Sequence, residues 1–314
     1  MRLKNCTRFL IELLLLLFAV VLSLLTGPSG PIGGEGYTGE IILDLRAPRT
    51  LLALLVGGSL ALAGVLMQAL FRNPLADPYI LGTSSGSALF AILIAPSPLE
   101  PLLAFVGGVA TTMMVYAMAW RERTETLLLV GMAMGSLASS LLSLLLFTKT
   151  SALSSMLFWL FGGLGLSTWG RTYLLLTALV LSMLLVLPLS MELDSLLLGE
   201  EKSRYLGVDV RKLMFCLLLV TCAITSLSVA VAGMIGFVGL MVPHLCRRIV
   251  GPKHRVLIPF SVIAGGVFLL FADVLARVIL APNEVPIGII TSMCGAPFFM
   301  YLVWRQRNAV RRWG

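Results

Sequence analysis

The sequence predicts an all-α protein that crosses a membrane many times. Of its 314 residues, 58% are hydrophobic and only 12% are charged, whereas a soluble domain carries about 25% charged residues. Apolar runs follow one another from Phe9 to Trp304, and a membrane-spanning helix needs about 20 such residues. The runs are continuous and do not alternate with polar residues, which argues against a transmembrane β-barrel.

Ten apolar stretches are candidate spans. The first follows a basic amino end and is long for the apolar part of a signal peptide, so we expect it to be retained as a membrane helix. The stretch 213–250 could be one long span or two short ones divided near Gly233–Gly236. With the division, the predicted spans are 9–27, 48–70, 79–95, 101–119, 126–147, 170–190, 213–232, 235–250, 256–279 and 286–304.

The distribution of Lys and Arg decides between nine spans and ten, because cytoplasmic loops are enriched in these residues. With nine spans, the basic residues divide almost evenly between the two sides, 11 to 12. With ten spans, 18 lie on the side of the two termini and five lie outside: Arg46, Arg49, Lys149, Arg171 and Arg277. The sequence therefore predicts ten spans, both termini in the cytoplasm, and a cytoplasmic connection at 191–212.

Several kinds of chemistry lack the residues that they need. The basic residues that give the net charge of +8 lie between the spans, as topology signals do, and do not indicate binding to nucleic acid. The five cysteines show no metal-binding spacing. No phosphate-binding G-x-x-x-x-G-K-[ST] loop occurs, so we expect no cofactor in this chain. Residues 82–86 match G-x-S-x-G, but a hydrolase would need a strand before Ser84 and a base near it; we favour a close-packing segment.

An ion-coupled carrier is the alternative from another functional class, because acidic residues within spans commonly mark ion or proton sites. Glu12 is close enough to the end of its span to reach the interface, and Asp77 lies in a turn. Asp273 precedes Arg277 by four residues, so the two can pair on one helix face. None of these acids stands alone in the middle of a span, which argues against this function.

Two sets of residues are candidate sites. Three arginines fall on the predicted outer face, where basic residues are rare. They are either interfacial anchors or a docking surface for an acidic partner: Arg46, Arg49 and Arg277. Span 126–147 carries a polar stripe at three- and four-residue steps, which either packs against a neighbour or lines a pathway: Ser136, Ser139, Ser140 and Ser143.

Four stretches of the chain resemble the permeases of iron-chelate and cobalamin ABC importers, the FecCD-like family. They follow the order of the family's motifs and leave only about the first 40 residues without a match. Each alone is weakly specific, but together they are highly specific. They read LRAPRTLLALLVGGSLALAGVLMQALFRNPLADPYILG (45–82), LLLGEEKSRYLGV (196–208), AGMIGFVGLMVPHLCRRIVGPKHRVLIP (232–259) and ADVLARVILAPNEVPIGIITSMCGAPFF (272–299).

The resemblance implies the type II ABC importer permease architecture, with residues 1–314 as a single transmembrane domain of about ten helices. It implies a second permease subunit, most simply a homodimer, around a central pathway. Two ATP-binding-cassette ATPase subunits would bind ATP and Mg on the inside, and a soluble substrate-binding protein would dock outside. The expected location is the cytoplasmic (inner) membrane of a bacterium or archaeon.

The function implied is that of a permease, without enzymatic activity, that moves a metal chelate across the membrane by alternating access. Iron-siderophore or haem is the first expectation for the substrate and cobalamin the second. In the family, outer arginines meet glutamates of the binding protein, which favours the docking interpretation of Arg46, Arg49 and Arg277. Residues 193–210 match two short helices that seat in the ATPase, and the expected coupling residues are Leu196, Leu197, Gly199 at the bend, Glu200, Glu201, Arg204, Tyr205 and Leu206.

Overall fold

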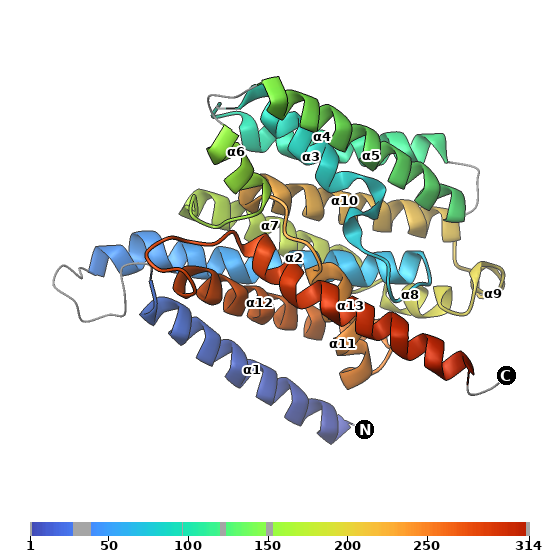
Figure 1. Cartoon of the computed structure of the whole chain (residues 1–314). Coiled ribbons are helices and arrows are strands. Elements are labelled where there is room, and N and C mark those ends of the chain that lie inside the picture. Colours follow the sequence, from blue (N-terminus) through green and yellow to red (C-terminus); the bar gives the residue numbers. More distant parts are fainter. Residues whose placement is uncertain (1, 28–38, 96, 120–123, 149–152, 312–314) are drawn as a thin grey trace.

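The computed structural model describes residues 2–27, 39–95, 97–119, 124–148 and 153–311, and this part of the chain is helical, with no strand. Arg121, Arg123, Lys149 and Arg312 of the topology count lie outside it. Each of the ten predicted spans corresponds to one helix (Figure 1): α1 Arg2–Leu25, α2 Ala47–Leu70, α3 Thr83–Ile94, α4 Glu100–Met118, α5 Thr124–Thr148, α7 Trp169–Val186, α10 Val210–Ala232, α11 Val238–Val250, α12 His254–Val278 and α13 Ile287–Arg311.

Five short elements complete the described chain: the π-helical η1 Ile41–Arg46, the 3-10 helix η2 Pro78–Leu81, α6 Leu153–Leu160, α8 Ser190–Leu196 and α9 Glu200–Tyr205. Within the described residues, seven helices are long and apolar enough to cross a membrane by themselves. The exceptions among the ten are α3, α11 and α13. The helix α3 and the apolar part of α13 are too short, and α11 is both short and more polar.

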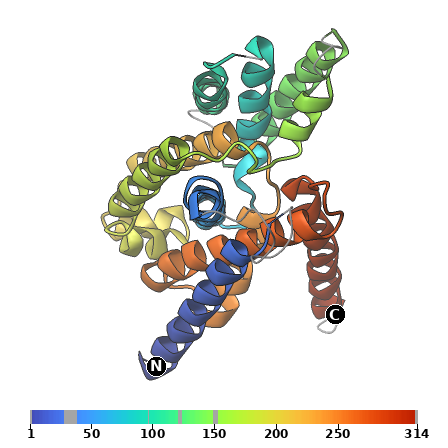
Figure 2. The same ribbon diagram turned by 90° about the vertical axis from the view of Figure 1, so that its left-hand side faces the viewer.

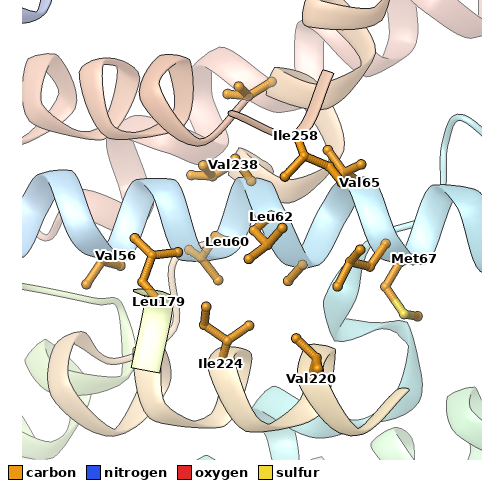
Figure 3. Close-up of a cluster of buried hydrophobic side chains, with 14 of the residues drawn as sticks. Val56, Leu60, Leu62, Val65, Met67, Leu179, Val220, Ile224, Val238 and Ile258 are labelled. Atoms are coloured by element: carbon orange, nitrogen blue, oxygen red, sulfur yellow. The ribbon is translucent and has the colours of Figure 1, made fainter. Parts of the chain in front are cut away.

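The helix α2 passes through the middle of the molecule. The continuous helix formed by η1 and α2 is 83% buried in its most apolar part, against 17% for α1. Figure 2 shows α2 end-on, with α7, α10 and α12 around it, and α11 packs on it as well. Side chains from all five helices form the buried cluster of Figure 3: Val56, Leu60, Leu62, Val65, Met67, Leu179, Val220, Ile224, Val238 and Ile258.

Glycines let α2 approach its neighbours closely. A side-chain carbon added at Gly57 would collide with the backbone oxygen of Gly265 in α12, and one added at Gly64 with that of Gly239 in α11. Lipid tails are as apolar as leucine, so membrane helices gain little hydrophobic stabilisation from touching and depend on close van der Waals contact. At these positions the glycines serve packing, as the sequence predicts.

Two predicted spans, 79–95 and 235–250, are interrupted, because their helices begin only at Thr83 and Val238. At 1.5 Å per residue, α3 and α11 measure about 18 Å and about 20 Å, less than the roughly 30 Å of a bilayer core. The residues before them meet: the Tyr79 hydroxyl donates to the Ile235 carbonyl at 3.0 Å and accepts from the Ile235 N–H at 3.3 Å. Non-helical backbone in a membrane needs such protein partners.

The two short helices α8 and α9 are present, as the resemblance implies. Gly199 lies between them with φ of +106°, a conformation that is open mainly to glycine. They lie at the same end of the molecule as the start of α1 and the end of α13 (Figure 1), which agrees with an even number of spans. The helix α12 runs from this end to the opposite one.

We expect the substitution Gly64→Ala to destabilise the protein, because the added carbon must push α2 away from the Gly239 backbone. Overpacking of this kind typically costs about 1–3 kcal/mol, so thermal unfolding of the purified protein in detergent should shift to lower temperature. Gly170→Ala in α7 is the matched control, since no atom lies within 4 Å of the added carbon. Equal unfolding temperatures for the two variants would contradict the close-packing account.

Candidate functional sites at the two ends of α12

Four charged side chains meet at the carboxyl end of α12. Arg49 of α2 donates to Asp273 from Nε at 3.0 Å and from Nη2 at 2.9 Å. The same guanidinium donates to both carboxylate oxygens of Glu284, in the connection between α12 and α13, at 2.8 and 3.0 Å. Arg277 pairs with Asp273 at 2.9 Å, which confirms the pairing that their spacing predicts. We call Arg49, Asp273, Arg277 and Glu284 the charged network.

The charged network holds α2, α12 and the connection after α12 together. Asp273 is completely buried, and a buried carboxylate is tolerated only when cations and hydrogen bonds compensate its lost hydration. Two guanidinium groups flank it, and Arg49 binds Glu284 in the two-pronged geometry that makes Arg–carboxylate pairs strong. Each charge in this network therefore depends on the others.

Arg46 and Arg277 also hydrogen-bond backbone carbonyls at the carboxyl end of α1. The last carbonyls of a helix have no partner within it. Arg277 donates to the carbonyls of Ser23 at 3.2 Å and Thr26 at 2.7 Å, and Arg46 donates to that of Leu24 at 2.8 Å. A cation at this end also interacts favourably with the helix dipole. Both arginines thus stabilise α1 from within the protein.

The structure brings the three predicted docking arginines to one end of the molecule but does not expose them equally. Arg46 and Arg277 are 6% and 2% exposed, so neither is an anchor with its charged end in water. The side chain of Arg49 is 12% exposed and lies beside the partly exposed Glu284. Docking stays a prediction, and of the three arginines Arg49 has the most exposed side chain.

At the opposite end lie α8 and α9, in what we call the coupling segment, residues 190–210. Its inner face is apolar and buried, with Leu193 and Leu196 against the membrane helices. Of the predicted coupling residues, Leu196 therefore faces inward, whereas Glu201 and Arg204 are exposed. Its outer face carries large apolar side chains in the open: Met191 80%, Leu197 36%, Leu198 58%, Tyr205 91% and Leu206 65% exposed.

Two polar contacts attach the coupling segment to the membrane helices. Asp194 of α8 binds His254, the first residue of α12, at 2.6 Å. Glu200 of α9 pairs with Arg72, just after α2, at 3.5 Å. Sequence reasoning did not find these contacts, because the partners are 60 and 128 residues apart and no spacing rule relates them.

An open cavity of about 440 Å³ lies between the coupling segment and α10. Its wall includes Glu192, Leu206, Asp209 and Lys212. Hydrogen bonds from the backbone N–H and the ammonium of Lys212 hold the pKa of Asp209 below its usual value, so Asp209 is negative at neutral pH and caps α10. The cavity and the apolar outer face together form a surface suited to binding a partner protein.

The serine stripe of α5 lies on an exposed face of this chain. Ser136, Ser139, Ser140 and Ser143 are all exposed. The hydroxyls of Ser140 and Ser143 donate to carbonyls one turn back on their own helix, each at 2.9 Å, and that of Ser139 donates to Ser85 of α3 at 3.0 Å. Whatever faces this stripe, whether a second subunit or a pathway, lies outside the single chain.

The described residues hold no group of three potential metal-binding side chains. Ser84 lies in the first turn of α3, and the residues before it form the 3-10 helix η2, not the strand that a nucleophile elbow requires. A multi-span helical domain of this kind, with buried ion pairs at one end, is that of a polytopic membrane protein. The chain belongs to the FecCD transport family, whose sequence profile matches residues 9–305.

Its relatives are permease proteins. The Hemin transport system permease protein HmuU of Yersinia pestis is 41% identical, covering 86% of this chain and 84% of the relative. The Fe(3+) dicitrate transport system permease protein FecD of Escherichia coli (strain K12) is 41% identical and covers 88% of each. The Cobalamin import system permease protein BtuC of Halobacterium salinarum is 41% identical, with 86% and 75% covered.

A solved structure of a transporter assigned to the metal-chelate ABC type, in an inward-facing conformation, superposes with a TM-score of 0.88. It is 33% identical, and the match covers 95% of this chain and 99% of that one. The chain is therefore a multi-pass, all-α transport permease and not an enzyme.

We expect Asp273→Asn to lower the stability of the protein strongly. The change leaves two arginines, one of them almost fully buried, without their shared counter-charge, and removing one partner of a buried ion pair typically costs about 3–5 kcal/mol. Thermal unfolding in detergent measures the effect. Asp209→Asn, which removes the exposed pair with Lys212, should leave the unfolding temperature close to that of the wild type, because exposed ion pairs contribute little. An equally small effect of Asp273→Asn would show that the network is not structural.

Proposed function

We propose that this chain is the permease subunit of an ATP-binding-cassette importer that carries a metal chelate across the inner membrane by alternating access. The observation that carries the proposal is the family match over residues 9–305, joined to an exposed apolar surface on the coupling segment. Two copies of the chain, two ATPase subunits and a soluble binding protein would form the complete importer. ATP and Mg would be bound by the ATPase subunits.

The coupling segment is the proposed seat of the ATPase. An aqueous surface does not normally expose large apolar side chains side by side, and such patches mark interaction sites. Tyr205 is 91% exposed and Leu206 65%, beside charged residues of both signs that would form the polar rim of an interface. This assignment places both termini in the cytoplasm, because the start of α1 and the end of α13 lie at the same end (Figure 1).

The binding protein is proposed to dock at the other end, over the charged network. Arg49 is the direct contact in this proposal, since its side chain keeps an exposed edge whereas Arg46 and Arg277 are buried. An incoming carboxylate would compete with Glu284 for the guanidinium. Arg46 and Arg277 would then act by holding α1 and α12 in place beneath the docking surface.

The transport pathway is proposed to run between two copies of the chain. The exposed serines of α5 form a mildly polar face, which is unfavourable against lipid but suitable for a hydrated pathway. Ser136, Ser139, Ser140 and Ser143 would line it without binding the substrate tightly. Iron-siderophore or haem is the proposed cargo, because relatives at 41% identity carry haemin and ferric dicitrate names; cobalamin is the alternative, because an equally similar relative carries that name.

Reconstitution tests the proposal directly. The permease with its ATPase subunits is placed in liposomes, the loaded binding protein is added, and uptake of haem, a ferric siderophore or cobalamin is measured. We expect uptake of one iron chelate that needs Mg-ATP and persists when ionophores collapse proton and sodium gradients. Uptake of cobalamin alone would establish the alternative substrate, and gradient-driven uptake without ATPase subunits would establish an ion-coupled carrier.

A double variant, Tyr205→Glu with Leu206→Glu, should reduce ATP-driven uptake about tenfold or more, as expected when central apolar contacts of an interface are lost. Arg248→Glu, an exposed change at the carboxyl end of α11, is the control and should leave uptake unchanged. Full uptake by the double variant would show that the ATPase seats elsewhere.

A further inference from the structure

We propose that Asp194 and His254 are positioning residues, which join the coupling segment to α12 so that displacement of the segment reaches the charged network. The inference rests on the proposed function, because it concerns how the ATPase moves the permease. It starts from one contact: a single carboxylate oxygen of Asp194 accepts two hydrogen bonds from His254, from the ring Nδ1 at 2.6 Å and from the backbone N–H at 2.9 Å.

The two hydrogen bonds make Asp194 the cap of a helix to which it does not belong. The first four N–H groups of α12 have no partner within that helix, and α8 supplies one. Pro259 lies in the second turn of α12 and donates no N–H, so the first turn lacks one of its own stabilising bonds. The amino end of α12 therefore depends on α8 for its position.

One side of this contact is buried. The His254 side chain is completely buried, whereas that of Asp194 is 37% exposed, and a charge-assisted hydrogen bond gains strength on the side from which water is excluded. Leu193 and Leu196 lie on either side of Asp194 in sequence and are also buried, so α8 is packed against the membrane domain around the contact. Arg247, in the last turn of α11, interacts electrostatically with the same carboxylate.

The second polar contact of the coupling segment is longer and has no fully buried partner. Arg72 and Glu200 are 38% and 32% exposed and 3.5 Å apart, and pairs that are open to water contribute little. A push on the coupling segment can therefore break the Arg72–Glu200 contact while Asp194 and His254 stay together. We therefore place α12 in the proposed route, because its contact with the segment is shorter and includes a fully buried side chain.

The other end of α12 is joined to the charged network. The helix has 25 residues, which corresponds to about 37 Å, and Asp273 and Arg277 lie in its last two turns. A movement of its first turn would thus reach Arg49 and Glu284 through Asp273, on the face where the binding protein is proposed to dock. One helix would connect the two functional ends of the permease.

The test uses the assembled importer in liposomes and compares substrate uptake per ATP hydrolysed. Asp194→Ala should lower this ratio about tenfold in importers isolated with both ATPase subunits bound, as the loss of charge-assisted hydrogen bonds predicts. Asp194→Asn keeps an oxygen that can accept both hydrogen bonds, so it should restore most of the ratio. Thr168→Ala, which removes the side-chain cap of α7, is the control for loss of a helix cap and should leave the ratio unchanged.

A double-mutant cycle separates this role from simple destabilisation. Asp194→Ala and His254→Ala should each lower the ratio, and the combined variant should be no worse than the more defective single variant, because both remove one contact. Losses that multiply, or a normal ratio in Asp194→Ala, would overturn the inference. Should Asp194→Ala fail to assemble, Asp194→Asn provides the test. An uptake ratio in Asp194→Asn as low as that in His254→Ala would also overturn the inference. Absence of ATP-driven uptake in the wild type would instead refute the proposed function.

Discussion

The burial of α2 in the middle of the molecule is the constraint on which the rest of the structure depends. A helix with protein on all sides must carry small residues where neighbouring backbones approach, and Gly57 and Gly64 meet that need against α12 and α11. The same burial leaves little water around Arg49, whose side chain is only 12% exposed. Arg49 must find its partners within the protein, and it finds them in Asp273 and Glu284.

The same rule explains why interrupted helices are tolerated. Backbone groups that lose their helical partners in a membrane must be satisfied by other parts of the protein. Tyr79 hydrogen-bonds the backbone of Ile235 at the break before α11. Arg46 and Arg277 donate to backbone carbonyls at the end of α1. Polar side chains in this protein therefore act first as partners for backbone and charge, and any role in transport is built on that arrangement.

Local patterns predicted much of the fold, whereas contacts between distant segments were beyond them. Apolar run length and basic-residue counts predicted ten helical elements, and the four-residue spacing predicted the Asp273–Arg277 pair. The start of α3 at Thr83 and of α11 at Val238 was not predicted, because the residues before them are as apolar as helical ones. The partners Glu284 of Arg49 and His254 of Asp194 depend on how helices pack, which no sequence spacing records.

The two ends of α12 give the molecule a physical route from the coupling segment to the charged network. Spin labels on the exposed Leu280, just beyond α12, and on the exposed Glu201 of α9 would report both ends in the assembled importer. The measurement is the label-to-label distance between the two permease copies, with and without a non-hydrolysable ATP analogue. The account predicts that both distances change together on nucleotide binding. A changed distance at Glu201 with an unchanged one at Leu280 would contradict it.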